Sequence, residues 1–125
     1  MPHDYQPWYA VDLDGTLAEY DHWRGVSHIG KPIAPMADRV KRWIAEGRNV
    51  RIFTARVSLG KRPTVQRKDE VAMAHRLIHI WCRKHLGFVL EVTCEKDFAM
   101  IELWDDRAVR VKINKGLIDN ECTDH

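Results

Sequence analysis

The sequence predicts an α/β fold in which helices pack against a mainly parallel β-sheet. Short apolar runs alternate with two longer segments of helical periodicity, and the early connections are long enough to contain crossover helices. Polar side chains also follow several of the runs directly, at the edge where parallel sheets bind ligands. Together these observations indicate a Rossmann-like three-layer sandwich built by a single domain, residues 1–125.

The first strand is expected to deliver the chain into a tight turn. Tyr9, Ala10 and Val11 form a short apolar run typical of a strand that is covered on both faces. Gly15 follows shortly afterwards and gives the backbone the freedom to turn sharply.

Two helices and four further strands are expected after this turn. The first helix, about residues 35–46, has Pro35 in its first turn and Gly47 just past its end. The second helix runs over about residues 64–86. Apolar or alternating runs predict the strands, at residues 49–53, 88–93, 100–104 and 109–113. The last run alternates apolar and basic residues, which is typical of a half-exposed edge strand.

Two segments have no regular pattern. Residues 18–34 are polar and aromatic and are expected to form a short flap loop beside the first turn. Residues 114–125 are polar and are expected to form a loosely held tail.

Composition is that of a folded protein. The chain is 45% hydrophobic and 30% charged, which is wrong for a disordered protein, and its formal net charge of +2 is too small to indicate nucleic-acid binding by itself. No apolar run approaches the roughly 20 residues of a membrane span, so a cytoplasmic location is expected. Three cysteines, an odd number without metal-ligand spacing, are expected to be reduced thiols.

Two carboxylates stand at the end of the first strand. Asp12 and Asp14 leave it on the same side, because strand residues alternate with period two. Two such carboxylates repel each other unless a cation or hydrogen-bond donors lie between them. A hard divalent ion such as Mg²⁺ would satisfy both. The alternative is a strand-end turn in which both aspartates are merely solvated.

Four polar signals occur in a fixed order. They are D-L-D-G-T-L at 12–17, I-F-T-A-R at 52–56, E-K-D at 95–97 and L-W-D-D-R at 103–107. In this order they resemble the haloacid dehalogenase (HAD) superfamily of aspartate-nucleophile phosphohydrolases. That family combines D-x-D-G-T, a Thr or Ser, a Lys and an acidic pair.

The resemblance implies a role for each matching residue. Asp12 would be the nucleophile that becomes a transient aspartyl phosphate, and Asp14 the general acid and base. Thr54 would donate a hydrogen bond to the phosphoryl group, and Lys96 would neutralise its charge. The expected ligands of Mg²⁺ are Asp12, the backbone carbonyl of Asp14, Asp105 and Asp106.

Each role has a structural alternative. Thr54 could be a turn residue, Lys96 an ordinary surface lysine, and the acidic pair a strand-end turn. Arg56 and Lys61 could replace Lys96, although Arg56 is better suited to a distal part of the substrate.

The segment at residues 80–87 and the acidic pair also resemble deoxyribonucleotidase-type phosphatases. Those enzymes carry a helical cap after the first motif, whereas the flap here is too short for one. A HAD-like core without a cap domain has an open site, which a bulky substrate or a neighbouring subunit of a homo-oligomer would cover. The expected substrate-binding residues are Ala55, Arg56, His22, Trp23 and Arg24.

The first hypothesis is therefore a Mg²⁺-dependent phosphatase. Its expected substrate is a phosphorylated small molecule, such as a nucleotide, or a nucleic-acid end, and no membrane partner is expected. One alternative is a catalytically silent HAD-like module that binds a phosphorylated partner. A less favoured alternative is a phosphotransferase.

Overall fold

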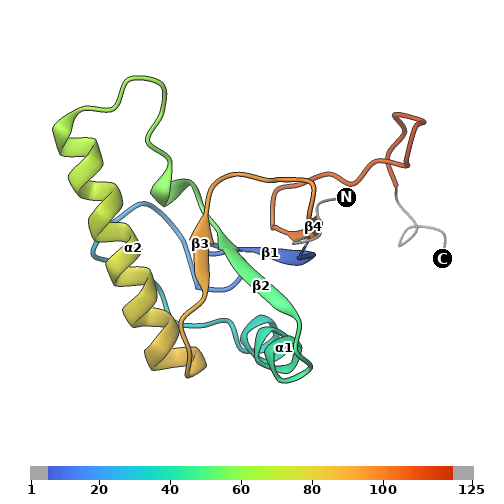
Figure 1. The fold of residues 1–125 in the computed structure, drawn as a ribbon, viewed down its shortest axis with the longest axis horizontal. Coiled ribbons are helices and arrows are strands. Elements are labelled where there is room, and N and C mark those ends of the chain that lie inside the picture. The colour runs from blue at the N-terminus through green and yellow to red at the C-terminus, as the bar shows by residue number, and fades with distance from the viewer. Residues whose placement is uncertain (1–5, 120–125) are drawn as a thin grey trace.

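The core of the protein is a four-stranded parallel sheet (Figure 1), seen in a computed structural model that describes residues 6–119. The strand order is β3-β2-β1-β4, and every neighbouring pair is parallel. The strands are β1 (Trp8–Asp12), β2 (Asn49–Phe53), β3 (Glu91–Thr93) and β4 (Met100–Trp104). The predicted α/β class with a mainly parallel sheet is confirmed.

Two α-helices connect the strands. Helix α1 (Ala34–Ala45) begins with a proline in its first turn and joins β1 to β2. Helix α2 (Val65–Leu86) joins β2 to β3; the Thr64 side chain accepts a hydrogen bond from the Arg67 N–H at its start. Gly87, at a φ of 91°, ends it in the left-handed conformation. A short 3₁₀ helix, η1 (Ala55–Val57), follows β2 directly.

Both helices cover the same face of the sheet. Their buried side chains belong to one apolar cluster with Val11 of β1, Ile52 of β2 and Val92 of β3. In the paired strands Val11 lies opposite Ile52, which in turn lies opposite Val92, so the three residues form one row across the sheet. This arrangement is the one that chirality predicts, because β1-α1-β2 and β2-α2-β3 step in the same direction and crossovers between parallel strands are almost always right-handed.

The opposite face is crossed by a short segment, residues 94–99. The chain must pass here from β3 at one edge to β4 at the other, and six residues are too few for a helix. Asp97 in this segment accepts a hydrogen bond from the Trp8 indole at 2.8 Å, and the Arg51 guanidinium stacks over the Trp8 ring. The described chain therefore lacks the second helical layer of the predicted three-layer sandwich.

The predicted edge strand at residues 109–113 does not join the sheet. Instead, residues 109–119 form a small hairpin, closed by a bridge between Val111 and Ile118 and by a turn in which Asn114 and Gly116 have positive φ. Figure 1 shows this red end of the chain extending away from the sheet and helices. Alternation of apolar and basic residues does not determine which strand a segment pairs with, and here Val111 alone of residues 109–113 forms a bridge, with Ile118.

Other elements agree with expectation to within a few residues. Strand β3 is shorter than the predicted 88–93, since Phe88 to Leu90 precede the ladder as irregular chain. The flap, residues 18–33, has no regular structure beyond isolated bridges. Cys82 and Cys94 carry free thiols; Cys122 and the end of the predicted tail lie outside the described residues. Neither described helix has the length and apolar character needed to cross a bilayer.

Candidate functional site

The candidate site lies where the strand order reverses. The chain goes from β1 to β2 on one side, whereas β4 pairs with β1 on the other side, so the carboxyl end of β1 is a switch point. Asp12 is the last residue of β1, and Asp105 follows β4 directly. Thr54 follows β2 in the same way. Three sequence signals that are far apart in the chain are thus placed at one edge of the sheet.

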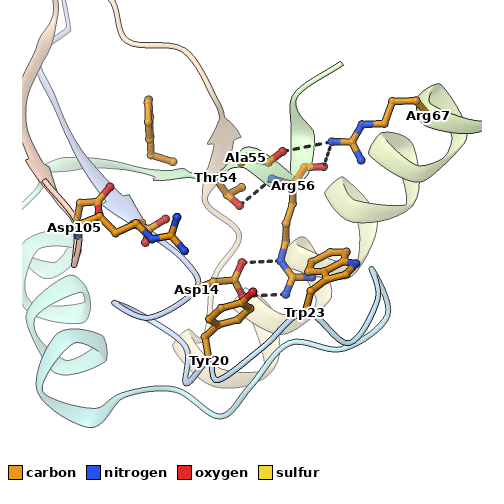
Figure 2. A pocket seen from close by; sticks show the side chains of 11 residues that line it. Asp14, Tyr20, Trp23, Thr54, Ala55, Arg56, Arg67 and Asp105 are labelled. Carbon is orange, nitrogen blue, oxygen red and sulfur yellow. Dashed lines mark hydrogen bonds and ion pairs between the residues drawn. The ribbon is translucent and has the colours of Figure 1, made fainter. Parts of the chain in front are cut away.

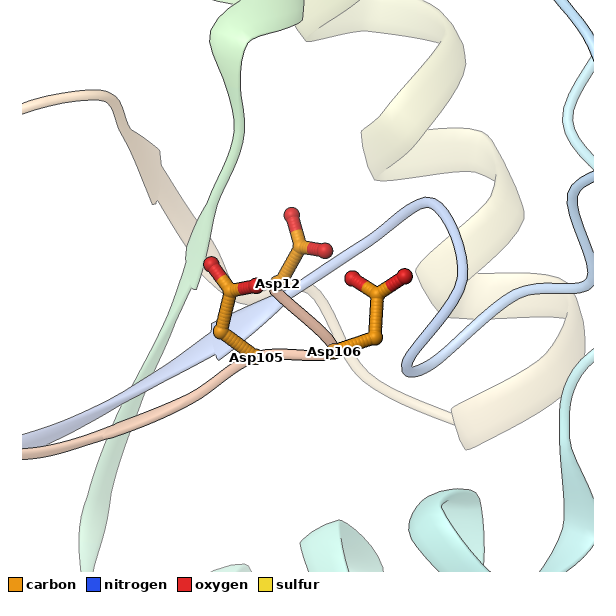
Figure 3. A group of neighbouring side chains, drawn as sticks. All are labelled: Asp12, Asp105 and Asp106. Carbon is orange, nitrogen blue, oxygen red and sulfur yellow. The ribbon is translucent and has the colours of Figure 1, made fainter. Parts of the chain in front are cut away.

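Three carboxylates converge at this edge (Figure 3). One oxygen each of Asp12, Asp105 and Asp106 lies within 4.8 Å of the others. The Arg107 backbone N–H donates to Asp105 Oδ1 at 2.7 Å and holds that side chain at the strand end. Both Asp12 and Asp105 are half-buried, while Asp106 is exposed.

Burial, together with the neighbouring carboxylates, raises the pKa of Asp12 to about 7, from an ordinary value of 3.8. Burial makes the largest contribution, followed by the negative charge of Asp105, by a hydrogen bond with Asp106 and by the charges of Asp106 and Asp14. A carboxyl group in this position is costly to ionise without a nearby cation. The site therefore favours either a proton or a positive charge between these oxygens.

Gly15 allows the turn after β1 to approach Asp106. Its φ is 90°, a conformation that side chains disfavour, and a Cβ atom built on it would lie 2.6 Å from Asp106 Oδ2. The turn is fixed by hydrogen bonds from the Leu17 N–H to the Asp12 carbonyl and from the Ala18 N–H to the Leu13 carbonyl. A glycine is thus required both for the turn and for the position of the acidic pair.

Asp14 points away from the carboxylate cluster and toward Arg56 (Figure 2). Arg56 Nε donates to Asp14 Oδ2 and Arg56 Nη2 to Asp14 Oδ1, both at 2.8 Å. The Arg56 side chain is almost fully buried. The Asp14 carboxylate therefore does not join the carboxylate cluster, and Arg56 binds a protein carboxylate rather than standing free for a distal part of the substrate.

Arg56 also fixes the flap. It donates to the His28 carbonyl at 2.9 Å and to the Val26 carbonyl at 3.4 Å, and its guanidinium lies 4.9 Å from the centre of the Trp23 ring. One side chain thereby links the turn after β1, the start of η1 and the flap. At the far end of the flap, the Trp81 indole of α2 donates to the Gly30 carbonyl at 2.9 Å.

The Thr54 hydroxyl caps η1 and still has its proton available for a hydrogen bond. Its buried Oγ1 accepts a hydrogen bond from the Arg56 N–H at 3.1 Å, which caps η1. Because the oxygen is the acceptor there, the hydroxyl proton stays available for a ligand. Arg67 of α2 holds the other end of η1 by donating to the carbonyls of Ser58, Ala55 and Arg56.

These groups line an open cavity of about 450 Å³. Tyr20 and Trp23 from the flap form an aromatic wall, and Phe53 and Ala55 lie at the end of β2. The remaining lining residues are charged or polar: Asp12, Asp14, Thr54, Arg56, Arg67, Asp105 and Arg107. The carboxylates, the threonine and an aromatic wall therefore face one space.

Some predicted site residues do not line this cavity. Lys96 is exposed in the segment that crosses the other face of the sheet, and its neighbour Asp97 already contacts Trp8 at the start of β1. His22 and Arg24 are exposed and pair with Asp21 instead.

Arg107 and Tyr20 line the cavity, although neither was predicted as a site residue. Of the three cationic side chains that line it, Arg56 pairs with Asp14 and Arg67 binds carbonyl groups. Arg107 makes no side-chain hydrogen bond or ion pair within residues 6–119. Its position directly after the acidic pair is the one signal that would have found it.

The carboxylate cluster suits a hard divalent cation. Three carboxylate oxygens within 4.8 Å of one another match the oxygen ligands that Mg²⁺ and Ca²⁺ prefer. Burial and the nearby carboxylates raise the pKa of Asp12, and a cation between these oxygens would favour its ionised form. These donors therefore fit the expected cofactor class, without distinguishing Mg²⁺ from similar ions.

Comparison of the chain with protein-family models, with curated proteins and with solved structures found no match. The site is therefore interpreted from its own geometry.

Proposed function

We propose that this protein is a HAD-like, Mg²⁺-dependent phosphatase that hydrolyses a phosphomonoester. The observation that carries the proposal is the meeting of Asp12 with Asp105 and Asp106 at the switch point, beside a cavity that Asp12, Asp105 and Thr54 line. A nucleophile, a cation-binding cluster and a hydroxyl donor then surround the position where a phosphoryl group would bind.

Asp12 is the attacking group in this proposal. One of its oxygens forms a bond to phosphorus while the bond from phosphorus to the leaving oxygen breaks, which gives an aspartyl phosphate on Asp12. Asp14 protonates the leaving oxygen and then takes a proton from the water that releases phosphate. The Thr54 hydroxyl donates to a phosphoryl oxygen throughout. A bound Mg²⁺ ion would hold the phosphoryl oxygens and neutralise their charge.

Arg56 orients Asp14 for this task. Its two hydrogen bonds fix the plane of the Asp14 carboxylate and keep it out of the cation-binding cluster. The two aspartates, only two residues apart, would therefore have different roles. Asp12 faces the carboxylate cluster, where a cation would bind, and Asp14 faces the flap side of the cavity.

Arg107 is the better supported candidate for the cation that Lys96 was expected to supply. It lines the same cavity as Asp12 and Asp105, whereas Lys96 lies on the crossing segment. A guanidinium can bind two phosphoryl oxygens at once, which an ammonium group cannot do with the same geometry. We therefore assign charge neutralisation of the phosphoryl group to Arg107.

The substrate is proposed to carry a planar group beside its phosphate. Tyr20 and Trp23 are partly exposed aromatic side chains in the cavity wall, where a nucleobase or another aromatic ring would stack. The cavity is open and has no cap above it. A nucleotide or a phosphorylated nucleic-acid end suits these features.

The test is phosphate release from an aryl phosphate, with and without Mg²⁺. Activity should require the metal and should be lost in Asp12→Asn. Undiminished activity of that variant would exclude Asp12 as the nucleophile. A panel of nucleotides, sugar phosphates and 3′- or 5′-phosphorylated oligonucleotides would then identify the substrate class.

A catalytically silent module that binds a phosphorylated partner is the second candidate. It is favoured by one observation: both oxygens of the Asp14 carboxylate are occupied by Arg56, and the lysine of the third motif lies elsewhere. Tight binding of a phosphorylated ligand together with no turnover in Mg²⁺ would support this candidate over the phosphatase.

A further inference from the structure

The hairpin formed by residues 109–119 exposes a row of large apolar side chains. Val109 and Val111 on its first strand and Ile113 in its turn have exposed fractions of 68%, 56% and 84%, and Leu117 and Ile118 on its second strand are also largely exposed. The hairpin extends away from the sheet and helices (Figure 1). So many apolar side chains on one projecting element mark an interaction surface.

The first strand of the hairpin has a free backbone edge. The Lys112 N–H donates to the Leu117 carbonyl and the Asp119 N–H to the Arg110 carbonyl, both at 2.8 Å. Because alternate residues of a strand direct their backbone groups to opposite edges, those of Val111 point outward. Val111 makes no backbone hydrogen bond within the described residues, so this edge can accept another strand.

The same chain offers a matching edge on β4. This strand pairs with β1 on one side, and no strand of the described residues pairs with its other side. Glu102, Leu103 and Trp104 form a regular ladder with β1 after an irregularity at the start of β4. An unpaired edge of this kind is a template for strand addition.

The two edges are complementary in polarity and charge. In β4, Ile101 and Leu103 alternate with Glu102, while in the hairpin the apolar row alternates with Arg110 and Lys112. Residues 100–106 contain three acidic residues and no basic one, whereas residues 109–118 contain three basic residues and no acidic one. Opposite charges on neighbouring strands stabilise the pairing and favour this partner over others.

Charge also argues against two hairpins pairing with each other. Antiparallel pairing of two copies of residues 109–113 about Val111 would place Arg110 directly opposite Lys112 of the other copy. Pairing with β4 replaces this repulsion by attraction. Within one chain, the hairpin projects away from its own β4.

We propose that two copies of this chain form a symmetric dimer in which the hairpin of each adds to the β4 edge of the other. Such an interface is isologous, so both contacts form together and both apolar rows are covered. The proposal does not depend on the phosphatase activity.

Charge reversal gives the sharpest test. Glu102→Lys places like charges across both contacts of the dimer, and so does Lys112→Glu. Each variant alone should raise the dimer dissociation constant about tenfold or more. When the two variants are mixed, both contacts of the heterodimer pair opposite charges, and dimerisation should return. Sedimentation over a range of protein concentrations measures the dissociation constant of each variant alone and of their mixture. Circular dichroism checks that each variant is folded.

Two further results decide the proposal. Ile113→Asp should also give monomers without lowering the melting temperature, because this side chain is exposed in the single chain. A wild-type protein that stays monomeric at all concentrations would overturn the proposal. The same holds if the monomer is explained by a hairpin that folds back onto the β4 edge of its own chain. A dimer that neither charge reversal weakens would place the interface elsewhere and would overturn it equally.

Discussion

Replacing Asp12 by asparagine should stabilise the metal-free protein while abolishing the proposed activity. The substitution keeps the size of the side chain and removes one of the negative charges that crowd the end of β1. Active sites often hold charges that oppose folding, so their removal commonly raises stability. The expected gain can be worked out from the pKa of Asp12.

The rise of this pKa from 3.8 to about 7 is equivalent to about 4 kcal/mol at about 1.4 kcal/mol per pH unit. Asp12 is half-buried, and solvent and side-chain relaxation reduce the effect, so we expect about 2 kcal/mol. For a domain of this size that corresponds to a rise in melting temperature of roughly 5–10 °C.

The sign depends on pH. The folded state holds the Asp12 proton more tightly than the unfolded state, so this proton stabilises the fold fully below about pH 4. The stabilisation is lost as the pH rises to about 7. The difference between Asp12→Asn and the wild type should therefore be small in acid and should reach its maximum near pH 8.

Thermal unfolding in a chelator at several pH values measures this difference. Asp38→Asn is the matched control, because Asp38 is exposed on α1 and its replacement should change stability by less than about 0.5 kcal/mol. Added Mg²⁺ should stabilise the wild type more than Asp12→Asn. Equal stability of the two proteins at pH 8 without metal would refute the idea that the carboxylates are crowded.

Four other substitutions test the site. Arg107→Ala should lower kcat/KM for a phosphomonoester about 100-fold, whereas Lys96→Ala should leave it nearly unchanged. Steady-state kinetics measures both values, and the opposite result would show that Lys96 is the essential cationic residue. Gly15→Ala should destabilise the protein by about 1–2 kcal/mol and weaken Mg²⁺ binding, since the added Cβ would displace Asp106. Urea unfolding measures the stability and metal titration the affinity. An unchanged metal affinity would contradict the steric argument. Arg56→Lys keeps the charge but loses the paired hydrogen bonds to Asp14, so kcat should fall about tenfold and a protease should cleave the flap faster. Unchanged kinetics would show that the paired hydrogen bonds are not needed for activity.

The four strands of the sheet and both helices were predictable because local sequence largely determines them. The apolar run before Asp12 and the periodic segment before Gly87 each correspond to an element close to its expected place. The convergence of Asp12 with the acidic pair was also predictable, since strands of a parallel sheet end at one edge.

Contacts between distant segments were harder to predict. The pairing of Arg56 with Asp14 joins residues 42 positions apart, and nothing in either segment requires it. The expected role of Lys96 rested on the order of motifs along the chain. The short crossing segment carries this residue toward the other end of the sheet, whereas Arg107 stays beside the acidic pair.

The geometry of the carboxylate cluster depends on how β4 is attached to the sheet. This strand is held to the sheet through β1 alone, and Trp104 at its end also packs against Trp43 of α1, with ring centres 5.2 Å apart. Local opening of β4 would break these contacts, whereas the contacts of α2 with β2 and β3 would remain. Detachment would separate Asp105 from Asp12. Under the proposed cation binding, cation affinity is therefore thermodynamically linked to the docking of one edge strand. Hydrogen exchange should accordingly slow in β4 when Mg²⁺ binds, and much less in β2.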